Sequence, residues 1–225
     1  MEQHSIKVIA HIRSDFPTKF GIPRQSGLVP ELRATVVFEP EFRNPDALRG
    51  IKGFSHLWLI WQFSEAVRED WSPTVRPPRL GGNTRMGVFA TRSPFRPNPI
   101  GLSCVKLEGI GQDAEFGSVL YVSGADLMDG TPIYDIKPYL PYADSHSDAC
   151  GGFAPLPKET VAVDCPPELL ERLPQEQQAA LLGVLSQDPR PQYQDDPQRI
   201  YRMRFADFEV KFRVENGTLY VTQIE

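Results

Sequence analysis

Proline restricts the fold of this chain more than any other residue type does. The 225 residues include 22 prolines, about twice the usual share of ~5%. An interior proline removes a helical hydrogen bond and clashes with the preceding turn, so this content excludes a fold made mainly of long helices. The hydrophobic fraction of 40% is still ample for a buried core.

Short strand-like runs fill the first two thirds of the chain. Residues 6–13 place apolar side chains on alternate positions, the period of a half-buried strand. Further runs cover 34–38, 56–63, 87–91, 101–107 and 118–123. No helical period of ten or more residues occurs before position 160. The sequence therefore predicts a mainly β fold, with a β-barrel-like N-terminal domain over residues 1–150.

The last third of the chain has a different character. Residues 166–186 show the only helical period, with Pro174 expected in a first helical turn. Asn216-Gly217 lies between two β runs, a pattern typical of a tight type I′ hairpin. We therefore predict a small α+β C-terminal domain over residues 151–225.

Charge is distributed unevenly. The net charge of −5 conceals a basic N-terminal half, with 14 basic and 9 acidic side chains in the first 100 residues. Residues 71–99 contain no acid and no lysine, but five arginines, Arg76, Arg79, Arg85, Arg92 and Arg96. Arginine offers a planar fork to phosphates and carboxylates, so this segment suits an anionic ligand; the alternative is a solvated loop.

A second basic set lies near the C-terminus. In the predicted hairpin region the residues opposite the apolar face are Arg202, Arg204, Lys211 and Arg213. This face either extends an RNA-binding track or is a solvated sheet surface.

Several function classes are excluded. No stretch approaches the ~18 apolar residues of a membrane span, and the N-terminus does not resemble a signal peptide, so we expect a soluble cytoplasmic protein. A strand followed by G-x-G-x-x-G and a helix, the usual dinucleotide site, is absent. Asp144, His146, Asp148 and Cys150 alternate without the spacing that a strand or helix would impose on metal ligands, and we expect no metal site.

Four proline-stiffened stretches carry most of the polar side chains expected to bind a ligand. They cover residues 21–25, 75–82, 87–103 and 126–139. Proline reduces the conformational entropy that a loop loses on binding, so stiff loops with exposed Arg, Gln, Asn or Asp indicate a ligand site.

At these stretches the chain resembles the TsaA-like family, in particular its bacterial tRNA (adenine-N6)-methyltransferases acting on threonylcarbamoyladenosine. The runs GVFATRSPFRPN (87–98) and DGTPIYDIKPY (129–139) make the resemblance specific. It implies an S-adenosylmethionine-dependent enzyme with a β-barrel unlike the Rossmann methyltransferases. It also implies a homodimer with cofactor pockets near the subunit interface, and tRNA, recognised at its anticodon loop, as the partner.

Family motifs assign a set of cofactor-contacting residues by resemblance. One turn contains Pro23, Arg24 and Gln25, and a second wall contains Arg92 and Leu102. A third contains Asp129, Gly130, Thr131 and Pro132, for which a plain β-turn is the alternative. After the first long β run, where family members offer a His-Arg pair, this chain has Ser64 and Glu65, so only backbone contacts would survive there.

The predicted reaction is methyl transfer to the exocyclic N6 of threonylcarbamoyladenosine beside the anticodon. That nitrogen must lose a proton, so we name Asp135 as candidate base and Lys137 as a binder of substrate charge; a structural Asp-Lys pair is the alternative. Unpaired bases would stack on Trp71 or Phe95, unless these are core residues. The rival functions are a non-catalytic S-adenosylmethionine- or RNA-binding regulator and methylation of a different substrate.

Overall fold

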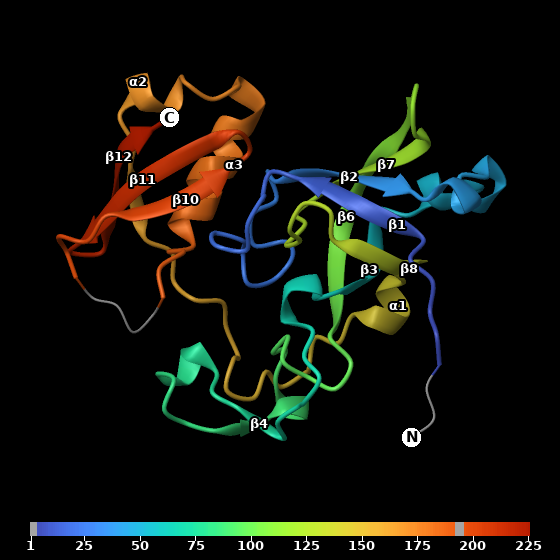
Figure 1. The fold of residues 1–225 in the computed structure, drawn as a ribbon, viewed down its shortest axis with the longest axis horizontal. Helices are drawn as coiled ribbons and strands as arrows, with labels where there is room; N and C mark the ends of the chain where they lie inside the picture. The colour runs from blue at the N-terminus through green and yellow to red at the C-terminus, as the bar shows by residue number, and fades with distance from the viewer. Residues whose placement is uncertain (1–3, 192–195) are drawn as a thin grey trace.

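The computed structural model describes residues 4–191 and 196–225. Figure 1 shows a strand-rich N-terminal unit on the right and a C-terminal unit on the upper left. A long loop around β4 (Thr74–Val75) projects below both units. The fold is mainly β, as predicted.

The N-terminal unit is a rolled antiparallel sheet. Its strands are β1 (Ala10–Ser14), β2 (Arg33–Phe38), β3 (His56–Gln62), β6 (Ile100–Asp113), β7 (Gly117–Ser123) and β8 (Pro132–Pro138). The order β1-β2-β7-β6-β3-β8 returns from β8 to β1 through a short seam of two residue pairs. This arrangement confirms the predicted barrel-like sheet.

Alternation of side chains places the first core inside this sheet. Along β3, Leu57, Leu59 and Trp61 are buried, whereas the residues between them are partly exposed. Ile12 and Val36 face the same interior and are fully buried. Residues of one parity thus form the core, and residues of the other parity form the outer face that carries the candidate site.

The connections are short 3-10 turns or irregular chain. Between β2 and β3 lie η1 (Pro40–Phe42), η2 (Pro45–Leu48) and η3 (Ile51–Gly53). The connection from β3 to β6 contains η4 (Ser64–Ala66), β4, η5 (Pro78–Leu80), β5 (Met86–Gly87) and η6 (Val88–Ala90). The short helix α1 (Pro141–Asp144) follows β8.

The C-terminal unit is α+β, as predicted. It contains β9 (Ala162–Asp164), α2 (Pro167–Leu170), α3 (Gln175–Ser186), β10 (Tyr201–Phe205), β11 (Phe208–Glu215) and β12 (Thr218–Ile224). The sheet order is β10-β11-β12-β9, with β9 parallel to β12. Asn216 and Gly217 have φ of 49° and 77°, which confirms the type I′ turn.

Some predicted elements were wrong. The first strand begins at Ala10, not at residue 6. The predicted strand at 87–91 is mostly η6, because the amide and the hydroxyl of Thr91 both turn back to the Val88 carbonyl. The barrel strand missing from the prediction is β8, whose terminal prolines concealed it.

The helical period predicted over residues 166–186 is confirmed, but it belongs to two helices. It is divided into α2 and α3, with Pro174 as the N-cap residue of α3 rather than a residue inside the helix. Proline has no amide hydrogen to continue the preceding helix, so the break falls before it.

The segment between β1 and β2, residues 15–32, joins the two units. Its residues Phe16, Val29 and Leu32 belong to the core of the C-terminal unit, together with α3 and the sheet β10–β12. The Phe16 ring packs edge-on against Phe205 at 5.8 Å. This segment carries the predicted cofactor turn, so its position depends on both units.

Candidate cofactor and RNA site

The predicted turn Pro23–Gln25 lies against the edge of the barrel. Just after the turn, the Ser26 hydroxyl accepts a hydrogen bond of 3.1 Å from the Cys104 amide on β6. The Gly27 amide donates to the Gly124 carbonyl at 2.9 Å. Pro23 is buried and Arg24 is exposed, so the turn is anchored through its backbone and presents a charged side chain.

The structure brings Arg92 to this turn. The Arg92 guanidinium donates to the Gln25 side-chain oxygen, and the Gln25 amide nitrogen donates to the Arg24 carbonyl. Two predicted cofactor walls, distant in sequence, therefore meet in space. Arg92 remains exposed, so its guanidinium has donors left for an anionic group.

Leu102 lies on an open edge of β6 beside the same turn. β7 pairs with β6 only from Lys106 onward. The Cys104 amide points away from β3 toward Ser26, and backbone groups two residues apart in a strand point the same way. The Leu102 N–H and C=O therefore face the turn and form a short hydrogen-bonding edge, suited to a heterocycle such as adenine.

The third predicted wall, Asp129–Pro132, has most of its polar groups engaged within the protein. The Asp129 carboxylate accepts from the Ser14 amide at 3.1 Å and lies 3.6 Å from Arg13. Thr131 is buried, and its hydroxyl donates to the Met128 carbonyl. These contacts favour the β-turn alternative for the side chains. The amides of Asp129, Gly130 and Thr131 also donate within the protein, so contact of this turn with a ligand would use carbonyl oxygens.

A partly buried carboxyl group that the sequence analysis did not assign, Asp126, lies under this site. Asp126 accepts a 2.5 Å hydrogen bond from Ser103, whose hydroxyl in turn accepts from the Trp61 indole at 2.9 Å. Burial raises the pKa of Asp126, and the Ser103 hydroxyl, the Arg92 charge and the Ser26 amide oppose that rise. The sequence signal that could have identified Asp126 is its position shortly after the buried strand β7.

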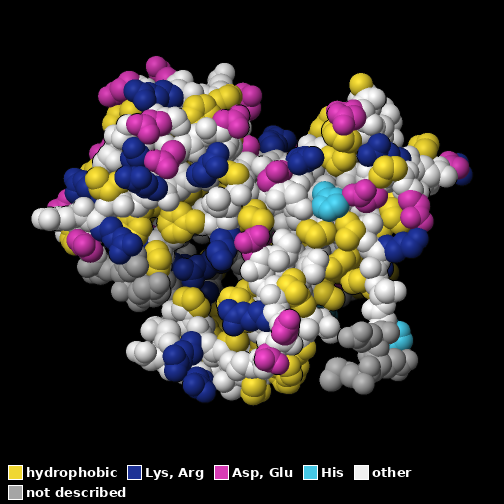
Figure 2. All heavy atoms as spheres, viewed as in Figure 1, with side chains coloured by type: hydrophobic (Ala, Val, Ile, Leu, Met, Phe, Trp, Pro, Cys, Tyr) yellow, Lys and Arg dark blue, Asp and Glu magenta, His cyan; other side chains and the backbone are white. Residues whose placement is uncertain are grey.

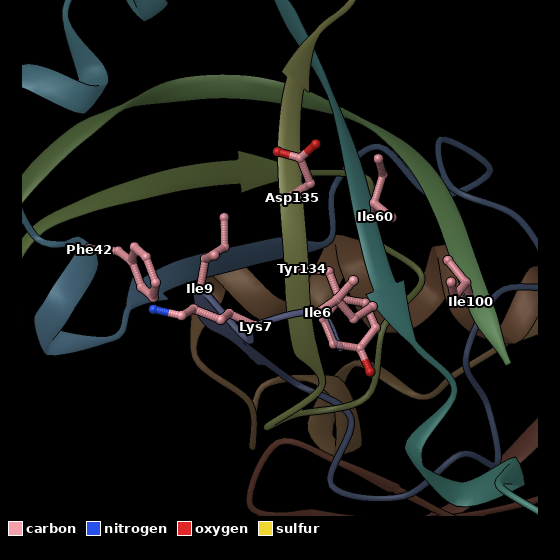
Figure 3. A pocket seen from close by; sticks show the side chains of 8 residues that line it. All are labelled: Ile6, Lys7, Ile9, Phe42, Ile60, Ile100, Tyr134 and Asp135. Atoms are coloured by element: carbon pink, nitrogen blue, oxygen red, sulfur yellow. The ribbon is translucent and has the colours of Figure 1, made fainter. Parts of the chain in front are cut away.

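Asp135 and Lys137 lie on the outer face of β8 and form an ion pair of 2.7 Å. Asp135 lines an open groove of about 480 Å³ with Tyr134, Ile60, Ile100 and residues near the N-terminus (Ile6, Lys7, Ile9, Phe42). Figure 3 shows Asp135 and Tyr134 on β8, with Phe42 on one side and Ile60 and Ile100 on the other. The pair is thus accessible, not buried.

Strand register relates this groove to the cofactor edge. Ile60 on β3 pairs with Leu102 on one side and with Asp135 on the other. All three residues lie on the outer face of the sheet. Two strand spacings separate Leu102 from Asp135, so these residues are about 10 Å apart. The candidate base and the candidate cofactor edge therefore share one surface.

The long loop between β3 and β6 carries the other predicted site residues, namely Ser64, Glu65 and the remaining arginines of residues 71–99. Ser64 and Glu65 form the exposed first turn after β3. Arg79 donates to the Leu156 carbonyl and Arg96 to the Thr91 carbonyl, while Arg76 and Arg85 are exposed. Trp71 and Phe95 are 53% and 41% exposed, so they are not core residues.

The basic face of the C-terminal sheet is partly neutralised. Lys211 contacts Glu209 and Glu225, and Arg213 pairs with Glu215. Arg202 and Arg204 on β10 are exposed. Figure 2 shows basic and acidic side chains mixed over this unit, which favours a solvated surface for Lys211 and Arg213.

The site fits S-adenosylmethionine by the chemistry of its groups. An exposed guanidinium matches a carboxylate, the Leu102 edge matches a heterocycle, and a partly buried carboxyl group at Asp126 offsets positive charge. Among residues 4–191 and 196–225, no group of three or more His, Cys, Asp or Glu side chains is arranged to hold a metal ion. The Asp144 carboxylate instead accepts from Trp58 and from the Leu140 amide.

No helix in the described part of the chain is long and apolar enough to cross a membrane.

Comparisons with known proteins identify the family of the chain. The tRNA-methyltransferase O N-terminal domain matches residues 11–145, and the corresponding C-terminal domain matches 158–225. A tRNA (adenine(37)-N6)-methyltransferase from Escherichia coli is 41% identical, covering 100% of this chain and 99% of its own. A relative from Pseudomonas aeruginosa, named a putative S-adenosylmethionine-dependent methyltransferase, is 45% identical to this chain. The match covers 92% of this chain and 91% of the relative.

A solved structure agrees over the whole length. The crystal structure of TrmO from Pseudomonas aeruginosa superimposes with a TM-score of 0.81 at 37% identity, covering 100% of this chain and 99% of that one. Both units, and not only the barrel, therefore match. The chain belongs to the tRNA-methyltransferase O family.

Proposed function

We propose that this protein methylates the exocyclic N6 of the adenosine beside the anticodon in tRNA, with S-adenosylmethionine as methyl donor. We further propose that the substrate adenosine carries the threonylcarbamoyl group. The observation that carries the proposal is the meeting of the Gln25–Arg92 contact, the open Leu102 edge and the Asp135 groove on one surface. The relatives named for this activity support it.

The cofactor would be held by the turn Pro23–Gln25, Arg92 and the Leu102 edge, with backbone groups of Asp129–Pro132 and of Ser64-Glu65 as further walls. S-adenosylmethionine, when bound, supplies a methyl group on a positively charged sulfur. The Arg92 guanidinium suits the carboxylate of its methionine part. The Leu102 N–H and C=O suit the edge of its adenine.

Asp135 is proposed as the group that takes the proton from N6. The lone pair of a ureido nitrogen is delocalised, so the nitrogen becomes a nucleophile when its proton leaves. The Asp135 carboxylate is accessible in the groove and forms an ion pair with Lys137 at 2.7 Å. Lys137 would also face the substrate's negative charge.

The arginines of the long loop are proposed to hold the anticodon loop. Arg76, Arg79, Arg85 and Arg96 lie in a segment without acids, and exposed Trp71 and Phe95 offer faces for unpaired bases. An arginine fork would also read the threonyl carboxylate. Arg202 and Arg204 extend this surface onto the C-terminal unit, whereas Lys211 and Arg213 contribute less because acids neutralise them.

The organisation that we propose follows from these assignments. Residues 1–150 form the cofactor-binding and catalytic domain, and residues 151–225 form a supporting domain. We also propose a homodimer, with the cofactor pockets near the subunit interface. We also propose that the protein acts in the cytoplasm, on the tRNA found there.

The test of the function compares two tRNA preparations, one from cells that make the threonylcarbamoyl group and one transcribed in vitro. Without the carboxylate, an arginine in the site stays desolvated and unpaired. Transfer of labelled methyl to unmodified tRNA should be at least about 10²-fold slower, which corresponds to ~2.7 kcal/mol. Equal rates would favour another substrate, and binding without transfer would favour a regulator.

Cofactor binding is tested separately by calorimetry. Arg92→Ala should weaken S-adenosylmethionine binding by about 1.5–3 kcal/mol, because it removes a charged hydrogen bond. Arg49→Ala is the matched control, because Arg49 is exposed, pairs with Asp46 and lies far from Arg92 in the sequence. Unchanged affinity of the Arg92 variant would remove this residue from the site.

A further inference from the structure

Asp126 lies where the proposed cofactor walls converge, yet no step of the proposed reaction uses it. Its carboxylate is bound to Ser103 on β6, which connects it to Trp61 on β3. Ser103 and Trp61 are both buried, so this chain of hydrogen bonds is fixed inside the barrel. The acid is therefore anchored from below by two strands.

Two further parts of the proposed pocket, the Ser26 turn and Arg92, lie near the same carboxylate. The Ser26 amide and the Arg92 charge both act on Asp126. Arg92 also contacts Gln25, and the Ser26 hydroxyl binds the Cys104 amide. Asp126 is thus the group that the turn, the arginine and the β6 edge share.

We propose that Asp126 is a positioning residue for the cofactor, whose carboxylate, anchored by Ser103, holds the Ser26 amide and the Arg92 guanidinium at the open edge of β6. It does so without reacting. Its negative charge also offsets that of Arg92, which otherwise would repel the cationic sulfur and the ammonium group of S-adenosylmethionine. The inference rests on the proposed function only for the identity of this cofactor.

The charge of Asp126 is costly for the fold, which separates a functional role from a structural one. Burial raises its pKa, so the ionised form is less favoured in the folded state than in the unfolded chain. Removing the charge should therefore not lower stability. Asparagine retains an oxygen that accepts from Ser103, so Asp126→Asn removes the charge while preserving this hydrogen bond.

The experiment measures S-adenosylmethionine affinity by calorimetry on the full chain, without tRNA. Asp126→Asn should weaken binding at least about tenfold, or ~1.4 kcal/mol, with an unchanged or raised thermal midpoint. Asp113→Asn, in the exposed turn at the far end of β6, is the control and should bind like the wild type. Unchanged affinity of Asp126→Asn overturns the proposal, and so does a parallel loss of affinity and stability.

A double-mutant cycle tests whether Asp126 acts through Arg92. If it does, Asp126→Asn combined with Arg92→Ala should lose clearly less affinity than the sum of the two single losses. Additive losses overturn this part of the proposal. Failure here is distinguishable from failure of the proposed function, because a wild type that binds the cofactor but does not methylate tRNA contradicts the function alone.

The pH dependence supplies a readout beyond stability. Arg92 is the charged group that faces Asp126, whereas Ser103, Trp61 and Ser26 are uncharged. Wild-type affinity should fall as the pH is lowered through the raised pKa of Asp126, since protonation removes its charge. Asp126→Asn should lack this fall, and a fall of the same size in the variant would overturn the proposal.

Discussion

Two long irregular segments frame the candidate site, and they are built in opposite ways. Residues 15–32 contribute Phe16, Val29 and Leu32 to the second core and are bonded to the barrel at Ser26 and Gly27. Of residues 64–99, in contrast, only Pro77 and Val88 are buried. The first segment is held by the second core and by hydrogen bonds to the barrel, whereas the second lies over the surface.

The difference matches what each segment is proposed to bind. A small cofactor needs groups held within a fraction of an ångström, and packing into one core together with hydrogen bonds to the barrel provides this. An RNA loop is a large polyanion whose contacts to arginine tolerate adjustment. Matched substitutions in the two segments should therefore differ in their effects on stability and on ligand binding.

The largest expected effect is on the first segment, residues 15–32. Phe16→Ala should lower the free energy of unfolding by about 3–5 kcal/mol, because it leaves a cavity against Phe205. Phe89→Ala in the open loop, where the ring is 74% exposed, should change it by less than ~0.5 kcal/mol. Urea denaturation of both variants makes the comparison. Similar losses would mean that the two segments are equally embedded.

The next effect concerns a glycine that the C-terminal unit requires. Gly21 has a φ of 99°, and an added Cβ would lie 2.2 Å from the Met203 sulfur on β10. Gly21→Ala should cost about 2 kcal/mol or more, because strain and overlap combine. Gly81→Ala in the open loop, at φ 72° with free space around it, should cost only about 1 kcal/mol.

Denaturation of both glycine variants gives these values, and calorimetry with S-adenosylmethionine shows whether the cofactor turn moves with Gly21. Weaker cofactor binding is expected for Gly21→Ala and not for Gly81→Ala. If the two variants behave alike in both measurements, β10 does not hold the turn.

A smaller, pH-dependent effect concerns the end of α3. Burial alone would raise the pKa of Asp188, but hydrogen bonds from Arg190 and Lys158 outweigh it and lower the pKa. The resulting stabilisation is present above the ordinary aspartate pKa and is lost as the pH falls through the lowered value.

Asp188→Asn should therefore be less stable than the wild type at neutral pH, with a difference that shrinks in acid. Asparagine also tolerates the φ of 49° at this position. Denaturant midpoints of both proteins over a pH series measure the difference. A gap independent of pH would contradict the ion-pair origin of this stabilisation.

The smallest effects are expected when single arginines are replaced and the salt dependence of tRNA binding is measured. Arg76→Ala and Arg85→Ala should each reduce the log-log salt slope of tRNA binding by about 0.7–0.9, if each contacts one phosphate. Lys211→Ala and Arg213→Ala should change it less, because glutamates already neutralise these cations. Filter binding over a range of salt concentrations measures the slopes; equal changes in all four variants would make both basic surfaces equivalent.

Local patterns were sufficient for part of this description. Alternation of apolar residues predicted β2, β3, β6 and β7, and Asn216-Gly217 predicted the C-terminal hairpin. These features depend on neighbours in sequence, so they can be read locally. β8 and the break before Pro174 show the limit, because there proline changes the element at its boundary without changing the apolar pattern.

The sequence by itself determined the fold class, the family and the polar loops from which a site would be built. Only the tertiary structure decided which of these loops meet: Arg92 reaches Gln25, β6 leaves an edge open at Leu102, and Asp126 becomes partly buried beneath them. The physical reason is that a contact between distant residues, and the loss of water around a carboxyl group, depend on how the strands are ordered and packed. No local pattern carries that information.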